Sequence, residues 1–135
     1  MTLQQEDRKA LVSIRLQRAK ETISEAKAII QLGYWRIAVN RLYYACYYAA
    51  SALLIKNGIT AHTHTGVINQ FGLNFVSKGL VNNEQGKLLK RLFELRQNGD
   101  YNDWFNIDEC DVVPFLKPAE NFIAEIEKFI DNNSI

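Results

Sequence analysis

The segment 34–57 constrains the fold more than any other part of this sequence, because it is apolar on almost every side. Its apolar residues include Ile37, Ala38, Val39, Leu42, Ala45, Cys46, Ala49, Ala50, Leu53 and Leu54. A helix that is hydrophobic all round is expected at the centre of a bundle or beneath a subunit contact. The dipeptide Asn57-Gly58 is a strong turn signal that should end it. The sequence therefore predicts a central helix surrounded by others.

Four further segments have the spacing of amphipathic helices. In residues 7–32, apolar side chains recur at alternating intervals of four and three, which gives one helix with one apolar seam. Gly33 can take the left-handed conformation that ends such a helix. Similar patterns cover residues 66–77, 83–98 and 111–131, and no alternating strand pattern competes with them. The chain is therefore expected to be helical throughout.

Polar residues and prolines mark the ends of two of these helices. Thr63 or Thr65 should cap the short third helix, because a hydroxyl oxygen can accept from the first free backbone N–H groups. Asp111 is the expected cap of the last helix, which places Pro114 in the first turn, where its missing N–H is harmless. Pro118 lies further along and should kink that helix.

The composition suits one globular domain. The chain has 135 residues, of which 47% are hydrophobic and 23% charged, an ordinary balance for a single core. No run approaches the roughly 20 apolar residues of a membrane span, and residues 1–10 lack the apolar stretch of a signal peptide, so we expect a cytoplasmic protein. Cys46 and Cys110 are too few and too unlike in setting to suggest a disulfide. The prediction is an all-α, up-and-down antiparallel bundle of four long helices plus one short helix, forming one domain over residues 1–135.

The net charge of +1 conceals an asymmetry along the chain. Residues 1–99 carry 14 Lys and Arg against 6 Asp and Glu, whereas residues 100–135 carry 2 against 9. One interpretation is that basic helices pack beside an acidic last helix, so that their fields largely cancel; the other is a basic surface that meets phosphates. Because nucleic-acid-binding proteins are usually more basic overall, composition favours the first interpretation.

Several polar motifs occur in the order found in one known family. They are Asn40-Arg-Leu-Tyr-Tyr-Ala45 in the second helix, His64-x-Gly66 before the short helix, and Arg96 followed by Asp100-Tyr101. In this combination the sequence resembles the HEPN family, helical domains associated with nucleotides and RNA and often paired with minimal nucleotidyltransferases. The resemblance covers nearly the whole chain. It implies a bundle that dimerises and groups its polar residues in a cleft near the dimer axis, and no cofactor is expected.

Two arginines are the strongest candidates for a binding site. Arg41, Tyr44 and Tyr48 are spaced by three and four residues, so they share one face of the second helix. Arg96 ends an apolar stripe on the fourth helix. Two guanidinium groups on the buried sides of neighbouring helices need partners.

Two interpretations of these arginines stay open. In the first, both bind a phosphate of a nucleotide or RNA while Tyr43, Tyr44 or Tyr101 stacks on a base. In the second, Asp100 or another carboxylate neutralises them in an interhelical network that fixes the packing. The expected ligand-binding residues are Arg41, Tyr44, Arg96, Asp100 and Tyr101.

The resemblance also leads to the hypothesis that this chain cleaves RNA. Many HEPN proteins are metal-independent ribonucleases whose signature is Arg, four to six residues, then His, the imidazole assisting attack by the RNA 2′-hydroxyl. Arg96 matches the Arg, but positions 101–103 hold Tyr, Asn and Asp. Catalysis would therefore need a histidine recruited in space, and His64 resembles a recurrent family position. Alternatively, His62 and His64 only cap or bond to a neighbouring helix; as a metal pair they lack a third ligand, so no metal site is expected.

Three functions follow as hypotheses. The leading one is a non-catalytic or weakly catalytic HEPN homodimer that binds a nucleotide or RNA phosphate and works with a nucleotidyltransferase in a toxin–antitoxin or defence-like module. The second is a ribonuclease toxin that uses Arg96 with a recruited His64. The third is a pure interaction module whose dimer interface contains Tyr43, Tyr44 and Tyr48. In some HEPN pairs the partner transfers AMP to a tyrosine near the ribonuclease motif, and Tyr101 resembles that target loosely.

Overall fold

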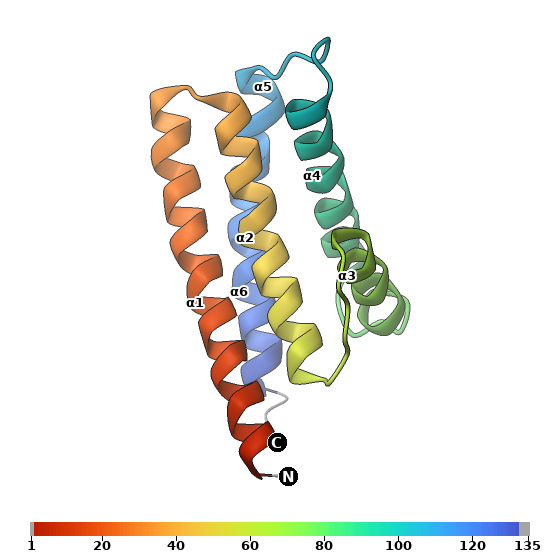
Figure 1. The fold of residues 1–135 in the computed structure, drawn as a ribbon. Coiled ribbons are helices and arrows are strands. Elements are labelled where there is room, and N and C mark those ends of the chain that lie inside the picture. The colour runs from red at the N-terminus through yellow and green to blue at the C-terminus, as the bar shows by residue number, and fades with distance from the viewer. Residues whose placement is uncertain (1, 133–135) are drawn as a thin grey trace.

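The computed structural model describes residues 2–132 and forms a bundle in which the long helices alternate in direction (Figure 1). The helices are α1 (Thr2–Leu32), α2 (Trp35–Lys56), α3 (His64–Phe71), α4 (Asn83–Tyr101), α5 (Glu109–Val112) and α6 (Leu116–Asn132). A π-helical turn (Gly72–Val76) extends α3, and a 3-10 turn (Val113–Phe115) joins α5 to α6. The described residues contain no strand. The predicted bundle of four long helices and one short helix is confirmed, with α5 as an additional single turn.

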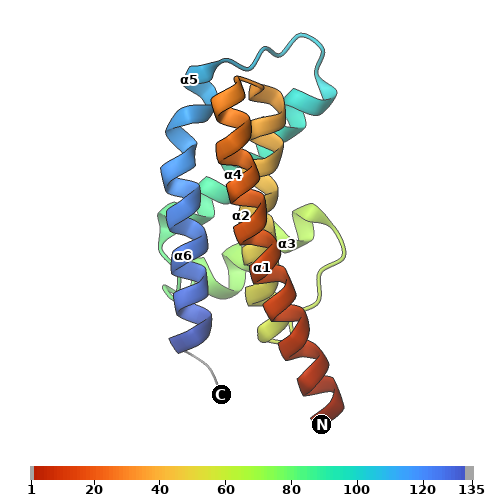
Figure 2. The same ribbon diagram turned by 90° about the vertical axis from the view of Figure 1, so that its left-hand side faces the viewer.

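Helix α2 is the centre of the bundle. It contacts α1, α3, α4, α5 and α6, and it lies between α1 and α4 (Figures 1 and 2). Several of its side chains are completely buried, among them Ala38, Leu42, Ala45, Ala49 and Leu53. The small alanine side chains allow neighbouring helices to approach closely. Although α2 is apolar, none of the helices within the described residues has the length and hydropathy of a membrane span.

Helix α1 buries its apolar seam against α2. The seam residues Val12, Leu16, Ala19, Ala26 and Ile30 are buried, as their spacing predicted. The helix begins at Thr2, earlier than the predicted start at residue 7, because no Pro or Gly interrupts the polar residues before it. It ends at Leu32, and the φ of 74° at Gly33, which follows, is the left-handed conformation expected there.

Ion pairs join α1 to the acidic last helix. Lys20 pairs with Glu127, and the Lys27 Nζ lies 3.4 Å from Glu120 Oε2. The expectation that basic helices pack beside an acidic last helix is therefore confirmed on this side of α1.

Helix α4 continues three residues beyond its predicted end at Asn98. Gly99 lies within this extension, and the Ile107 side chain packs where a side chain of residue 99 would be. A Cβ on Gly99 would lie only 2.7 Å from Ile107 Cδ1. The extension places Arg96 and Asp100 one turn apart on the same helix.

The start of the last helical region differs from the sequence-based prediction. Asp108, not Asp111, is the N-cap; Asp111 belongs to the first turn of α5 and accepts a hydrogen bond of 3.0 Å from the Asp108 backbone N–H. The helix is interrupted at Val113–Phe115, one turn before Pro118. Because Pro118 has no N–H for the Pro114 carbonyl and its ring crowds that group, the preceding turn tightens.

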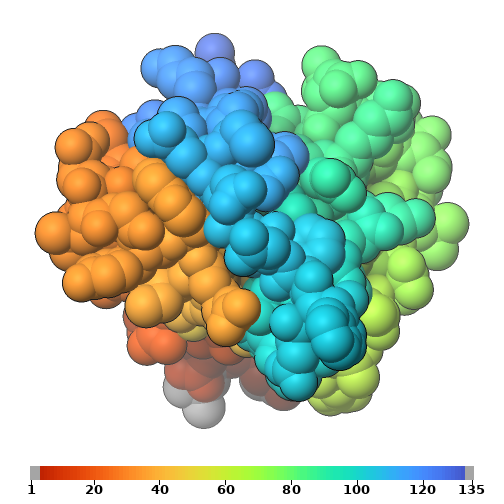
Figure 3. Space-filling model, turned by 90° about the horizontal axis from the view of Figure 1, so that it is seen from above, coloured from red at the N-terminus to blue at the C-terminus, as the bar shows by residue number. Residues whose placement is uncertain are grey.

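One end of the bundle gathers three segments that are far apart in sequence. The turn between α1 and α2, the α5 region and the residues that follow α4 come together there (Figure 3). The two ends of the described chain lie at the opposite end (Figure 1). Tyr43, His64 and Arg96, which belong to the polar motifs singled out in the sequence, lie where α2 faces α3 and α4.

Candidate functional site

An aromatic cluster lies where α2 faces α3 and α4. We define it as Tyr43, Tyr44, Tyr47, Tyr48, His64 and Phe93. The four tyrosines are successive positions on one side of α2, and their rings are 5.2–6.0 Å apart where they touch. The His64 ring packs on Tyr47 with centroids 4.6 Å apart. The cluster therefore connects three helices through ring contacts.

Helix capping positions His64 in this cluster. Thr63 is the N-cap of α3, and its Oγ1 accepts a hydrogen bond of 2.9 Å from the Gly66 backbone N–H. His64 is thus the first residue of α3, two residues before the predicted start, and its Nδ1 lies 2.8 Å from the Tyr43 hydroxyl. The histidine bonds to a neighbouring helix, as one interpretation of the sequence held. Its Nε2 has no hydrogen-bond partner among the residues that the structure describes.

The environment keeps both members of this hydrogen bond uncharged. Burial lowers the pKa of His64 from its ordinary value, and the positive charge of Arg96 lowers it further. Burial also raises the pKa of Tyr43, because its ionised form would be desolvated. At neutral pH the pair is therefore a neutral imidazole held in place by a protonated phenol.

Arg96 is the least satisfied polar side chain of the site. Its side chain is only 13% exposed, and its guanidinium carbon lies 5.7, 5.3 and 5.9 Å from the ring centroids of Tyr43, Tyr44 and Tyr101. Nε lies 3.2 Å from Asp100 Oδ2 but is buried without a hydrogen bond of good geometry. No described residue accepts a hydrogen bond from the two terminal nitrogens either. A cation that is largely buried and short of acceptors is suited to receive an anion.

Arg41 differs from Arg96 in that its nitrogens already have acceptors. Nη1 donates to Glu25 Oε1 at 3.3 Å, while Nε and Nη2 donate to Asn40 Oδ1 at 3.2 and 2.9 Å. Its guanidinium carbon lies 5.5 Å from the Tyr44 ring, so both arginines contact the same tyrosine. Each arginine therefore has a carboxylate beside it, Glu25 for Arg41 and Asp100 for Arg96, as the second interpretation expected, but only Arg41 also donates hydrogen bonds.

The structure brings all five predicted ligand-binding residues together. Arg41 and Arg96 both contact Tyr44; Asp100 pairs with Arg96, and Tyr101 packs on Arg96 with 73% of its surface exposed. Their role in binding stays a prediction.

The predicted interface residues do not form one group. Tyr43 has 0% of its surface exposed and bonds to His64, so its side chain belongs to the protomer's own core. It was wrongly placed at a subunit contact and among the rings available to a base. Tyr44 and Tyr48 are half-buried and keep part of their surface open.

Sequence reasoning missed three residues around the aromatic cluster. Tyr47 has the closest ring contact to His64; it follows Tyr44 by three residues, a spacing that could have identified it. Arg18 lies over the Tyr48 ring at 5.6 Å, and the Arg15 Nη1 donates to Ser51 Oγ at 3.5 Å. Both come from α1, and no local signal indicated which side of α1 would face these tyrosines.

Other reactive groups take no part in the cluster. Cys46 is completely buried, and desolvation raises the pKa of its thiol, so it stays protonated. Cys110 is an exposed free cysteine. Within the described part of the chain, no three His, Cys, Asp or Glu side chains are grouped as a metal site requires.

Comparison with known proteins identifies the family. The family model of the HEPN domain matches residues 12–129. A Thermotoga maritima protein named "UPF0332 protein" is 36% identical over 126 residues, which cover 93% of this chain and 96% of that protein. A Methanocaldococcus jannaschii protein named "Putative toxin MJ0605" is 35% identical over 126 residues, covering 93% of this chain and 85% of the relative. With this match over most of its length, the chain belongs to the HEPN domain family.

Proposed function

We propose that this HEPN protein binds a phosphate of a nucleotide or RNA at Arg96, within a toxin-like module. One observation carries the proposal: Arg96 is largely buried among aromatic rings, yet none of its nitrogens donates a hydrogen bond to a described residue. The Methanocaldococcus jannaschii relative named "Putative toxin MJ0605" supports the toxin-like context. A guanidinium fork matches the oxygens of a phosphate and forms charge-assisted hydrogen bonds with them.

The surrounding side chains have distinct roles in this proposal. Tyr101, which packs on Arg96 and has 73% of its surface exposed, offers a ring on which a base stacks, whereas the Tyr44 ring lies against both arginines. Arg41 adds positive charge near the phosphate, although its hydrogen bonds to Asn40 and Glu25 limit its direct contacts. Asp100 orients Arg96 through their ion pair, as a carboxylate one helical turn away can.

The proposal extends to two protein partners. A second copy of the chain would contact the half-buried Tyr44 and Tyr48, in keeping with the dimerisation that the family resemblance implies. A nucleotidyltransferase would act on this protein, or regulate it, when the nucleotide or RNA is bound. Sedimentation of the purified protein, and of its mixture with such a partner, tests both contacts.

Calorimetry tests the binding site directly. Titration with inorganic phosphate, AMP and a short single-stranded RNA should show binding of at least one of them to the wild-type protein. Arg96→Gln should weaken it by about ten- to a hundredfold, the scale of a hydrogen bond to a charged group. Arg91→Gln is the matched control, because Arg91 is exposed on the same helix and takes no part in the aromatic cluster. Equal affinity in the two variants, or no binding by the wild type, would contradict the proposal.

A second candidate function, RNA cleavage, rests on the placement of His64. Its ring packs against Tyr43, Tyr44 and Tyr47, two of which also contact Arg96, and its Nε2 is free of described partners. In this mechanism the RNA 2′-oxygen bonds to phosphorus and the bond to the 5′-oxygen breaks. His64 takes the proton of the 2′-hydroxyl and returns a proton to the leaving oxygen, while Arg96 stabilises the charge on the phosphate.

The two histidines allow a matched test of this second function. His64→Gln should abolish formation of the 2′,3′-cyclic phosphate product from single-stranded RNA. His62→Gln should leave it intact, because His62 is exposed and makes no contact in the aromatic cluster. RNA that stays intact with the wild-type protein would remove this candidate without affecting the binding proposal.

A further inference from the structure

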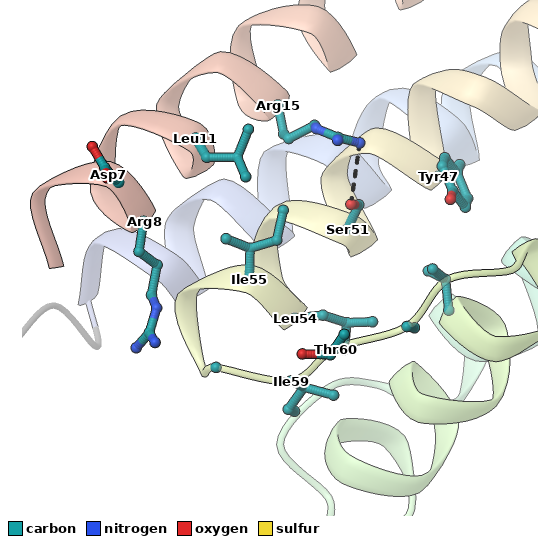
Figure 4. A pocket seen from close by; sticks show the side chains of 13 residues that line it. Asp7, Arg8, Leu11, Arg15, Tyr47, Ser51, Leu54, Ile55, Ile59 and Thr60 are labelled. Atoms are coloured by element: carbon teal, nitrogen blue, oxygen red, sulfur yellow. Dashed lines mark hydrogen bonds between the residues drawn. The ribbon is translucent and has the colours of Figure 1, made fainter. Parts of the chain in front are cut away.

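A pocket of about 410 Å³ opens beside the aromatic cluster, on the side of α1 (Figure 4). Helix α1, the C-terminal half of α2 and the segment 58–61 that leads to α3 form its walls. Apolar side chains, among them Leu54, Ile55 and Ile59, make up much of the lining. Its volume falls within the range of roughly 300–1,000 Å³ that small-ligand sites have. The pocket is large enough for part of a nucleotide.

The pocket lining carries an excess of positive charge, with two arginines against one carboxylate. Arg8 and Arg15 extend from α1 toward it (Figure 4), and neither forms an ion pair with a described carboxylate. The one hydrogen bond of Arg15 is the long contact with Ser51. Asp7 also lines the pocket but pairs with neither arginine. The two arginines are seven positions apart, which is about 10 Å along a helix.

Two rings, Tyr47 and Tyr44, connect this pocket to the Arg96 site. Tyr47 lines the pocket, and its ring centroid lies 4.6 Å from that of His64 and 6.0 Å from that of Tyr44. Tyr44 in turn lies under the Arg96 guanidinium. A series of cations and partly exposed rings therefore runs from Arg96 through Tyr44 and Tyr47 to Arg15 and Arg8.

We propose that this path binds a single-stranded RNA of several nucleotides, with one phosphate at Arg96 and the following nucleotides along Tyr47 and in the Arg8–Arg15 pocket. The inference rests on the proposed phosphate site and specifies its substrate class. Proteins bind single strands through a basic groove that follows the backbone and through aromatic rings that stack on the bases. The bases of a duplex are paired and stacked, so they cannot lie on Tyr47. An acidic peptide would satisfy the arginines but would leave the tyrosine rings without stacking partners.

Fluorescence anisotropy with ligands of increasing length tests this path. The ligands are AMP, a dinucleotide, a single strand of about ten nucleotides and a duplex of the same sequence. Their riboses carry 2′-fluoro groups, so that cleavage by 2′-hydroxyl attack cannot occur. The proteins are the wild type, Arg96→Gln, the double variant Arg8→Gln/Arg15→Gln, Tyr47→Ala and the control Arg91→Gln.

The double variant should weaken binding of the long strand by about tenfold or more while leaving AMP binding unchanged. The affinity of the double variant for the long strand should also depend less on salt. The slope of log affinity against log salt concentration should fall by about 0.7 for each arginine removed. Tyr47→Ala should weaken the long strand by about tenfold, whereas Arg96→Gln should weaken every ligand. Ultraviolet cross-linking of the long strand should then label the peptide that contains Tyr47.

Three outcomes overturn the inference, and they are distinguishable from one another. If AMP binds through Arg96 but the long strand binds with the same affinity in the double variant and the wild type, the pocket is not on the path and only this inference fails. Equal affinity for the duplex and the single strand excludes the stacking on Tyr47. If the wild type binds neither AMP nor RNA, the proposed function fails and the inference with it. Circular dichroism and thermal denaturation of each variant confirm that the fold is intact.

Discussion

The two flanks of helix α1 use positive charge in opposite ways. On one flank, Lys20 and Lys27 form ion pairs with carboxylates of α6. On the other, Arg8, Arg15 and Arg18 face the pocket and the tyrosines, and none of them has a carboxylate partner in the described residues. Because each residue turns the helix by about 100°, the two sets lie on either side of the same apolar seam.

This difference shows why net charge is a poor guide to a protein's partners. The whole chain has a net charge of only +1, which argued against a nucleic-acid binder. The cancellation is local, however: the acids of α6 neutralise the lysines next to them and not the arginines across the seam. A surface field depends on such local pairing and on distance, since salt screens charges beyond about 10 Å. One helix can therefore combine two different flanks. The cohesive flank (Lys20 and Lys27) is held to α6 by ion pairs, and the arginine flank (Arg8, Arg15 and Arg18) is suited to an anionic ligand.

The largest expected effect comes from removing the buried side chain in the middle of the aromatic cluster. Tyr43 is fully buried and its ring contacts Tyr44, Tyr47, His64 and Phe93. Tyr43→Ala should lower the free energy of unfolding by about 3–5 kcal/mol, since it removes a large aromatic ring and leaves a cavity. Urea denaturation measures the loss. Tyr43→Phe, which removes only the hydroxyl, should cost about 1 kcal/mol; equal losses in the two variants would show that the ring is not what supports the site.

Charge reversal on each flank should separate stability from binding. Lys27→Glu places a carboxylate opposite Glu120 and should lower the free energy of unfolding by about 1 kcal/mol without changing RNA affinity. Arg18→Glu reverses a charge that makes no ion pair in the described residues, so stability should hardly change while RNA affinity falls several-fold. Thermal denaturation and fluorescence anisotropy on both variants check this contrast. A loss of stability in both variants, or a loss of RNA affinity in both, would contradict this contrast between the two flanks.

A smaller effect is expected in the titration of His64. Burial and the Arg96 charge lower its pKa below the ordinary value of about 6.5, so its NMR titration midpoint should lie below that value. Arg96→Gln should raise the midpoint, because one of the two causes is removed. His64→Gln assigns the resonance. A midpoint that does not respond to Arg96→Gln would mean that the two side chains are not electrostatically coupled.

The same pKa determines the sign of a pH effect on stability. The unfolded chain protonates His64 near pH 6.5, whereas the native state resists protonation until a lower pH. This part of the stability is complete above about pH 6.5 and is lost progressively as the pH falls toward the native pKa. His64→Gln should reduce that loss in urea denaturation series taken at several pH values.

The smallest expected effect belongs to the cohesive flank. Lys20 and Glu127 are both partly exposed, with side-chain exposures of 47% and 32%. A double-mutant cycle with Lys20→Gln and Glu127→Gln should give a coupling of about 0.5 kcal/mol that weakens at high salt. A coupling several times larger would indicate that this flank stabilises the bundle much more than a surface ion pair normally does.

Much of the fold was predictable because helices have a local periodicity. The seam of α1 and the all-round apolar character of α2 depend only on residues three and four apart, and both predictions were confirmed. The errors fell at helix ends. Helix α4 continues through Gly99, and no pattern near residue 99 indicates the contact that Ile107 makes there. The cap at Asp108 was a missed local signal, since Asp108 and Asp111 have the spacing of a capping box.

The site was predictable in its residues and not in their partners. Arg41 and Tyr44 share a helix face, and Arg96 and Asp100 are one turn apart, so these two contacts follow from spacing. Sequence alone could not show that the Arg41 guanidinium would donate a hydrogen bond to Glu25, which lies on α1. It also could not show that Tyr43 would turn inward and hold His64, since that contact joins residues of α2 and α3.

Local spacing was thus sufficient to determine that the chain is an all-helical bundle, which helix is central and which polar residues face the same way. Packing between helices decided everything that joins distant segments: His64 beside Tyr47, Arg96 over Tyr44, and arginines of α1 beside tyrosines of α2. The physical reason is that periodicity defines a helix's faces, whereas the neighbour that each face meets depends on how all the helices together bury their apolar surface.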